Sequence, residues 1–295
     1  MTILIALVPG RSDTGALHLG AMLARSSVED VTVVSVVPAP WPPDPYRADE
    51  EYLALQESIA ETTLTNARQH LGGAPLGVDT VVRRASSVSA GLLEVITERN
   101  VSMVVVGSSS SGLLGRVMLG GVVERVLHSN EVPVAISPRG FHPARDTEFT
   151  RISVALGRAD RGSRLLTRAA STARAAGVAL RVVCFAVRPA ASLAVGLPEG
   201  AERLVVDEWV GGLERDVATA LEAGRQDGDG AVSTQVEITV GEGATWSEAL
   251  YDVAWADGDV LVVGTSSSPL NRFLGSHASK IVRSCPVPVV LLARA

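Results

Sequence analysis

The chain has 295 residues, of which 46% are hydrophobic and 20% are charged, so it is long enough for one large or two ordinary domains with buried cores. Its 26 basic and 32 acidic residues give a formal charge of −6, which argues against a nucleic-acid partner bound by phosphate neutralisation. Lys280 is the only lysine and no Gly-Lys-Ser/Thr triplet occurs, which excludes a Walker-A phosphate loop.

The first half of the chain alternates apolar strands with helices. Short β-branched runs predict strands at residues 3–8, 31–37, 78–84, 103–107 and 133–137. Apolar residues at helical spacing predict helices between them, at residues 16–25, 50–71, 88–99 and 121–127.

The second half shows the same alternation. It predicts strands at residues 152–156, 179–185, 235–240, 260–264 and 288–292. It predicts helices at residues 164–176, 204–223, 246–255 and 277–282. Such alternation indicates an α/β fold of the doubly wound type, with a parallel sheet covered on both faces and ligands at the carboxyl ends of the strands.

The two halves are also similar in sequence. TILIALV at residues 2–8 matches RISVALG at 151–157, MVVVG at 103–107 matches VLVVG at 260–264, and VPVAIS at 132–137 matches VPVVLL at 287–292. We therefore predict one domain at residues 1–140, a polar linker at 141–150 and a second, similar domain at 151–295.

Other features indicate a soluble cytoplasmic protein. Cys184 and Cys285 are too few for a disulfide framework and predict two buried thiols in a reducing compartment. The first residues lack a charged region and a long apolar run, which argues against a signal peptide, and no apolar stretch of about 18 residues predicts a membrane span. The five histidines show no metal-ligand spacing, so we expect no metal site.

Glycine- and serine-rich segments follow corresponding strands in the two halves. Residues 107–121 read GSSSSGLLGRVMLGG, and residues 264–276 read GTSSSPLNRFLGS. A tight loop of this composition, followed by a helix N-terminus, can hold a phosphate through backbone N–H groups.

This pair of loops, strands and Val-Pro-Val segments resembles the universal stress protein family, in two copies that cover essentially the whole chain. The resemblance implies two Rossmann-like domains of the adenine-nucleotide alpha-hydrolase type. It also implies that the strands at 132–137 and 287–292 pair antiparallel, which would form an intramolecular pseudo-dimer.

The family signature is G-x2-G-x9-G-[ST], whose glycines and final hydroxyl surround the phosphates of ATP. In the first half, Gly107 and Gly120 occupy the outer glycine positions, but Ser110 replaces the middle glycine and Gly121 replaces the hydroxyl residue. The first copy of the motif is therefore altered.

The second copy departs differently. Gly275 and Ser276 match the final pair, Ser267 replaces the middle glycine, and the spacing from Gly264 is two residues short. The nucleotide-site residues that the resemblance implies over both halves are Leu7, Val8, Pro9, Val36, Gly107, Ser108, Ser110, Gly120, Gly121, Val122, Gly264, Thr265, Ser267, Gly275 and Ser276.

The family also carries an aspartate at the end of the first strand, which hydrogen-bonds the adenine or its ribose. Val8 and Gly157 occupy that position here, and neither has a side chain that accepts a hydrogen bond. Asp13 and Asp160 lie further along, where we expect them to cap helices.

A competing motif lies at residues 14–21. TGALHLGA resembles the HIGH signature of class I aminoacyl-tRNA synthetases and related nucleotidylyltransferases, with His18 as the first histidine and Ala21 in place of the second. No KMSKS-like loop accompanies it. We expect His18 to be a half-buried helix residue.

Together these features favour a non-enzymatic regulatory or binding protein of the stress response, with eroded nucleotide sites. The first alternative binds ATP or another adenine nucleotide at residues 107–122, with slow hydrolysis, and the second is a nucleotidylyltransferase-like enzyme that uses His18. We expect no catalytic residue, no required cofactor, no nucleic-acid or membrane partner, and a homodimer as the further assembly. The sequence does not identify a protein partner.

Overall fold

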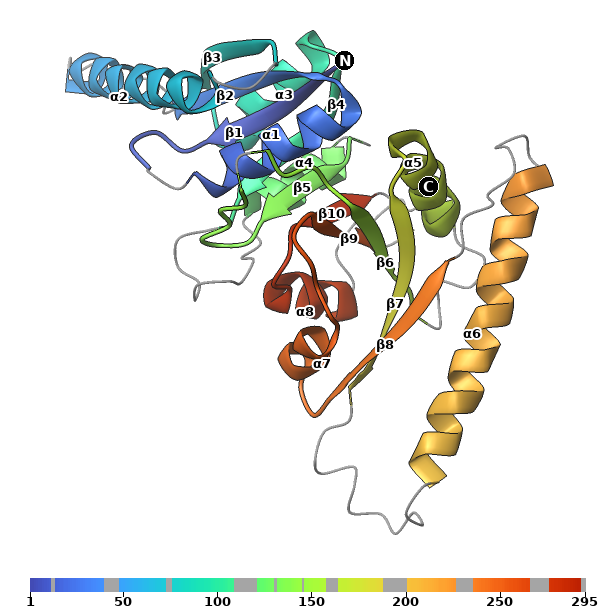
Figure 1. The fold of residues 1–295 in the computed structure, drawn as a ribbon. Coiled ribbons are helices and arrows are strands. Elements are labelled where there is room, and N and C mark those ends of the chain that lie inside the picture. The colour runs from blue at the N-terminus through green and yellow to red at the C-terminus, as the bar shows by residue number, and fades with distance from the viewer. Residues whose placement is uncertain are drawn as a thin grey trace. The chain divides into compact units, whose positions relative to one another are not determined.

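The computed structural model describes residues 1–11, 14–39, 48–72, 76–108, 121–129, 132–144, 146–157, 164–187, 201–226, 236–265 and 276–292. The described residues through Glu148 form one compact unit, and those from Phe149 onward form a second (Figure 1). No helix in these ranges is long and apolar enough to cross a membrane.

The first unit is a parallel α/β sheet. Its elements are β1 (Thr2–Leu7), α1 (Gly15–Ser27), β2 (Asp30–Pro38), α2 (Ala48–Leu71), β3 (Val78–Ala85), α3 (Val88–Glu98), β4 (Val101–Gly107), α4 (Gly121–Ser129) and β5 (Val134–Ser137). The strands pair in the order β3-β2-β1-β4-β5, and every pair is parallel.

The second unit repeats this plan. Its elements are β6 (Arg151–Ala155), α5 (Arg164–Ala176), β7 (Ala179–Val187), α6 (Ala201–Gln226), β8 (Glu237–Gly243), α7 (Trp246–Asp252), β9 (Asp259–Gly264), α8 (Ser276–Ser284) and β10 (Val289–Leu292). The order β8-β7-β6-β9-β10 is that of the first unit, and all pairs are parallel. The α/β class is confirmed, and within the described ranges each of the eight predicted helices and ten predicted strands is present, whereas the pairing of β5 with β10 stays a prediction.

Helices cover both faces of the sheet in each unit, which explains the long apolar runs in the central strands. In the second unit, α5 and α6 lie on one face and α7 and α8 on the other (Figure 1). In the first unit, Ile5 packs so closely under α1 that a Cβ at Gly20 would lie 2.2 Å from the Ile5 side chain. A glycine at this position lets the helix approach the sheet.

Several predicted boundaries in the second unit differ from the structure; helix α6, for example, extends three residues beyond its predicted range at each end. The differences at β8 and α7 have a visible cause. Strand β8 runs on to Gly243, past the predicted end at residue 240, because it keeps pairing with β7 through Val187. Helix α7 ends at Asp252 and not at Trp255. The Asp252 carboxylate accepts a hydrogen bond from the Glu242 N–H of β8 at 2.9 Å. The Trp255 indole N–H donates to the Leu250 carbonyl at 2.7 Å, so a side chain bonds a carbonyl group in the last turn of the helix.

In the second unit, strand β8 approaches helix α7 very closely at Gly241, and a substitution there tests this packing. A Cβ there would lie 2.1 Å from the Ala249 carbonyl oxygen of α7, a backbone atom that cannot move alone. We expect Gly241→Ala to lower the free energy of unfolding by about 2–4 kcal/mol, measured by urea denaturation.

The matched control is Gly211→Ala in α6, where a Cβ meets nothing within 4 Å. Alanine favours the helix by about 0.5–1 kcal/mol over glycine, so this variant should be as stable as the parent or more stable. Equal stability of the two variants would contradict the close packing of α7 on β8.

Candidate functional site at the carboxyl edges

The strand order places one switch point in each sheet. Strands β1 and β4 are neighbours, yet the chain continues from β1 toward β2 on one side and from β4 toward β5 on the other. Strands β6 and β9 are related in the same way. In such sheets the crevice for a ligand lies outside the carboxyl ends of these two strands. The predicted loops at residues 107–121 and 264–276 begin at those ends.

Within the described residues, the end of β1 offers no carboxylate. Val8 directly follows the strand and is 57% exposed, so an apolar side chain stands where the family's aspartate would be. Leu7 and Pro9 are half-buried beside it. The turn continues to Gly10, which has a φ of +72° and donates its N–H to the Thr63 hydroxyl of α2 at 3.0 Å.

The carbonyl that ends this strand is bonded in the same way in both units. The Ser35 hydroxyl donates to the Leu7 carbonyl at 3.3 Å, and the Cys184 thiol donates to the Leu156 carbonyl at 3.2 Å. The alignment of β1 with β6 and the strand registers make these residues equivalent. The Cys184 thiol, like that of Cys285, is buried, as the sequence predicts.

The first amides of both glycine-serine loops belong to the sheet. The Ser108 N–H donates to the Ser137 carbonyl at 3.1 Å, and the Thr265 N–H donates to the Leu292 carbonyl at 2.9 Å. Their side chains are also buried, at 7% and 1% exposure. The sequence suggested that N–H groups directly after the strand are free for a phosphate; at these two residues they extend the strand pairing.

Donors remain at the helices that follow. Gly121 is the exposed first residue of α4 and Val122 comes next, while the exposed Ser276 begins α8. The N–H groups of a first helical turn lack partners within the helix and favour an anion. Gly107 and Gly264 end β4 and β9 as predicted, whereas Ser110, Gly120, Ser267 and Gly275 lie outside the described residues, as do Asp13 and Asp160.

Val36 belongs to the core and not to the surface of this site. It is 3% exposed, and its Cγ1 would lie 2.7 Å from a Cβ at Gly91 of α3. Its equivalent in the second unit is Phe185, whose ring lies 6.1 Å from that of Trp246, which in turn lies 5.3 Å from His277. Phe185 and Trp246 are half-buried and His277 is exposed. This group of rings could not be identified from the sequence, because its members come from three separate elements.

Ser137 is a further residue that sequence reasoning missed. It ends β5, is fully buried, and its hydroxyl has no hydrogen-bond partner within the described part of the chain. A buried hydroxyl without a partner costs free energy, so it is a candidate contact for a bound ligand near Ser108.

His18 lies on α1, and its environment favours the uncharged ring. Burial, and then the neighbouring His142, His70 and Arg25, lower its pKa from 6.5 to about 4. Its Nε2 is buried without a hydrogen-bond partner among the described residues. The predicted half-buried helix position of His18 is confirmed, and Ala21 of the HIGH-like segment is buried in the same helix.

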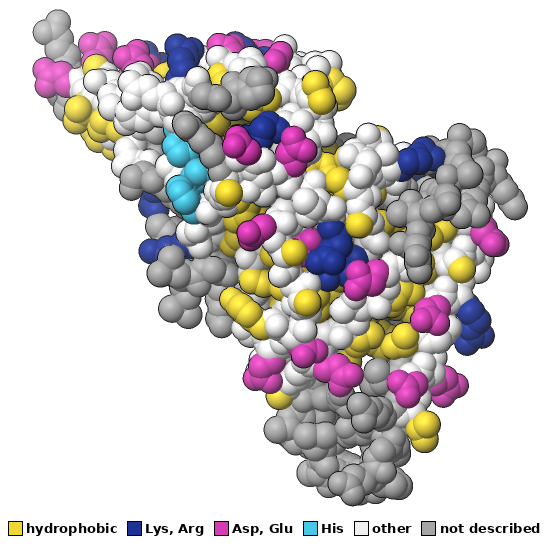
Figure 2. Space-filling model, viewed as in Figure 1, with side chains coloured by type: hydrophobic (Ala, Val, Ile, Leu, Met, Phe, Trp, Pro, Cys, Tyr) yellow, Lys and Arg dark blue, Asp and Glu magenta, His cyan; other side chains and the backbone are white. Residues whose placement is uncertain are grey.

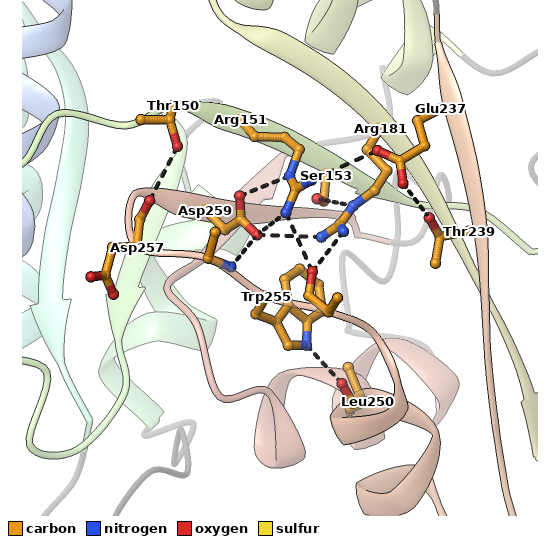
Figure 3. Close-up of polar contacts among 12 residues, drawn as sticks. Thr150, Arg151, Ser153, Arg181, Glu237, Thr239, Leu250, Trp255, Asp257 and Asp259 are labelled. Carbon is orange, nitrogen blue, oxygen red and sulfur yellow. Dashed lines mark hydrogen bonds and ion pairs between the residues drawn. The ribbon is translucent and has the colours of Figure 1, made fainter.

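At the opposite, amino-terminal edge of the second sheet, charged side chains form a cluster that the sequence analysis overlooked (Figure 3). Asp259 accepts two hydrogen bonds from Arg151, at 2.9 and 2.7 Å, and one from Arg181 at 3.4 Å. Arg181 also donates to the Ser153 hydroxyl at 3.0 Å, and its guanidinium carbon lies 4.8 Å from the centre of the Trp255 ring. Burial, followed by the charge of Arg151, lowers the pKa of Arg181 below its ordinary value.

The equivalent place in the first unit holds hydroxyl groups. Thr2 and Thr32 correspond to Arg151 and Arg181, and their hydroxyl oxygens lie 3.1 Å apart. The Ser102 hydroxyl donates to the Thr2 carbonyl at 3.2 Å. The charged cluster therefore joins strand ends at an edge remote from the crevice, and its arginines are already bonded, so its role is structural.

The buried carboxylate of this cluster should be essential for stability. Asp259→Ala leaves two arginines without their shared partner, so we expect a loss of about 3–5 kcal/mol in the free energy of unfolding. The control is Glu237→Ala, because Glu237 is 58% exposed and lies 3.7 Å from Arg151.

Removing that exposed partner should cost less than about 1 kcal/mol. Chemical denaturation of both variants measures the difference. A mild effect of Asp259→Ala, close to that of the control, would contradict the structural role of the cluster.

Comparisons with known proteins agree with this architecture. A sequence profile of the Universal stress protein family matches residues 1–138 and 148–293. The universal stress protein Rv2319c of Mycobacterium tuberculosis is 34% identical over 297 aligned positions, which cover 99% of each chain.

Two solved structures share the fold over 99% of this chain. One is a universal stress protein from Archaeoglobus fulgidus, with 19% identity, a TM-score of 0.59 and 98% of its own chain covered. The other is a functionally unknown protein from Pseudomonas aeruginosa, with 15% identity, a TM-score of 0.57 and 92% covered. With two family matches along its length and a relative of the same extent, the chain belongs to the universal stress protein family.

Proposed function

We propose that this protein is a non-enzymatic regulatory or binding protein of the stress response whose two carboxyl-edge crevices have lost tight binding of adenine nucleotides. The observation that carries the proposal is the end of β1, where the exposed Val8 replaces a hydrogen-bond acceptor. In the second unit, the exposed Gly157 has no side chain at the same place. A ribose or adenine donor that entered either crevice would lose its bond to water without gaining one to these residues.

The backbone N–H groups that already take part in strand pairing support the same proposal. Because the N–H groups of Ser108 and Thr265 bond the neighbouring strands, a triphosphate would draw its donors from the rest of each loop and from the first turns of α4 and α8. Loss of one buried acceptor costs about 1–3 kcal/mol, which weakens binding about 5–150-fold.

A second candidate is nucleotide binding in the first unit at residues 107–122. The hydroxyl of Ser137, which has no hydrogen-bond partner among the described residues, and the exposed start of α4 favour it, since both offer polar groups near the end of β4. Gly121, Val122 and Ser137 would contact the phosphates of the nucleotide, and this alternative includes slow hydrolysis of bound ATP. This candidate predicts that nucleotide binds to the first unit and not to the second.

Calorimetric titration with ATP, after measurement of the nucleotide that purifies with the protein, separates the two candidates. Our proposal expects no stoichiometric nucleotide and a dissociation constant weaker than about 100 μM, a free energy of roughly −5.5 kcal/mol. Micromolar binding would overturn it. If that binding disappeared in Gly120→Val, the second candidate would replace it.

Restoring an acceptor tests the cause of the loss. Val8→Asp should tighten ATP binding about 5–150-fold over the parent. The matched control is Val28→Asp, because Val28 is an equally sized and 91% exposed side chain of the same unit, so it adds the same charge elsewhere. Equal effects of both substitutions would show that net charge, and not the missing acceptor, governs affinity.

The enzymatic alternative has its own assay. If the HIGH-like segment formed an adenylate, exchange of pyrophosphate into ATP would depend on His18 and would vanish in His18→Ala. We expect no such activity, because the Nε2 of His18 is buried and is therefore not accessible to the phosphates of ATP. A homodimer remains our expectation for the assembly, and sedimentation of the purified chain measures it.

A further inference from the structure

Three imidazoles from three separate segments of the first unit meet at one place. His18 lies on α1, His70 lies in the last turn of α2, and His142 lies in the connecting segment, which we define as residues 139–148. The ring centre of His18 lies 4.6 Å from that of His70 and 4.2 Å from that of His142. Both ring pairs meet edge to face, and Figure 2 shows a patch of histidine side chains on the visible face.

A second contact joins the connecting segment to the same helix. Arg25, two turns after His18 on α1, donates from Nη2 to the Thr147 carbonyl at 2.6 Å. The segment is therefore bound to α1 at two points, one through a ring contact and one through a hydrogen bond.

Among the described residues, the charged groups that act on His18 are all basic. Those that act on it are His142 from the connecting segment, His70 from α2 and Arg25 from α1 itself. Asp146 and Glu148 of the segment are exposed and are not among them. Strands β1, β4 and β5, which also pack on α1, have no ionisable side chain, and the carboxylate of Asp30 in β2 accepts the Gly77 N–H.

The position of His18 suits only the neutral ring. Its Nε2 is buried and has no hydrogen-bond partner in the described residues, so a proton there would have no acceptor. No group of three or more His, Cys, Asp or Glu side chains in the described ranges is arranged to hold a metal ion. These contacts therefore point to protons, and not to a metal, as the species to which the cluster responds.

We propose that His18, His70 and His142 form a proton-responsive latch, in which the neutral ring of His18 holds the connecting segment on α1 and protonation of that ring releases it. Protonation adds positive charge beside Arg25 and opposes both contacts of the segment. The latch is independent of nucleotide binding at the carboxyl edges.

The pH range follows from the burial of His18. Burial first, and then its basic neighbours, lower its pKa from 6.5 to about 4, so the docked segment binds fewer protons than the released one. Docking is then strongest above pH 6.5 and weakens as the pH falls toward 4. The full shift corresponds to about 300-fold, since each pKa unit is tenfold, and the docking equilibrium changes by less than this because His70 and Arg25 stay beside His18 when the segment leaves.

Amide hydrogen exchange of the full chain, read by mass spectrometry from pH 7.5 to 4.5 and corrected for intrinsic exchange, tests the latch. We expect peptides that cover residues 139–148 to lose protection as the pH falls, while peptides from β4 and β9 keep theirs. Protection of residues 139–148 that does not change with pH would overturn the proposal.

Substitutions identify the titrating group. His18→Phe keeps a ring of similar size that cannot be protonated, so the pH dependence should shrink at least tenfold. His142→Phe, at an exposed position, should shrink it too and serves if the first variant does not fold. His277→Phe, an exposed histidine of the second unit, is the control and should leave it unchanged. An undiminished pH dependence in both Phe variants of the cluster would overturn the latch.

Discussion

The structure depends on one constraint, the parallel pairing of β1 with β4 and, in the second unit, of β6 with β9. The chain leaves the two strands of each pair in opposite directions, so their carboxyl ends are not bridged by a shared connection. The buried side chains of these strands hold the sheet together. The register of the pairing determines which residues lie at the edge of the sheet. Val8, Ser108 and Thr265 lie where they do for this reason.

The two units keep this backbone plan while the chemistry at the sheet edges differs. Ser35 and Cys184 donate hydrogen bonds to equivalent carbonyl groups, those of Leu7 and Leu156. The contact is therefore the same in both units, although the donor is a hydroxyl in one and a thiol in the other. At the amino-terminal edge, the hydroxyls of the first unit correspond to a buried ion cluster around Asp259 in the second. Edges tolerate such exchange because the apolar core between them supplies most of the stability.

Much of the fold could be predicted from the sequence, because strands buried on both faces give continuous apolar runs and the intervening helices give a different period. The same apolar runs explain why the burial of Val36 beneath α3 was not predicted. In a strand with several valines, the sequence does not show which valine lies beneath a helix and which reaches the edge of the sheet. The end of α7 was missed because it depends on the Asp252 carboxylate meeting an N–H of β8, a contact between separate elements.

From the sequence, the candidate site could be assigned to the carboxyl edge of each sheet, but its hydrogen-bond donors could not be identified. The loops follow β4 and β9 as expected, yet whether the N–H of Ser108 is available depends on how far β5 extends beside it, which is a matter of tertiary register. The contact among the three histidines could not be predicted from the sequence for a related reason. Their side chains are far apart in sequence and meet only because α1, α2 and the connecting segment pack together.

The most direct test of the central claim is to follow the backbone amide resonances of Val8, Ser108 and Thr265 by NMR while excess ATP is added. Our account predicts that the Ser108 and Thr265 amides exchange slowly, as hydrogen-bonded members of the sheet, and that none of the three resonances moves with ATP. A saturable shift of all three resonances at micromolar ATP would contradict it, because the carboxyl edge would then bind the nucleotide.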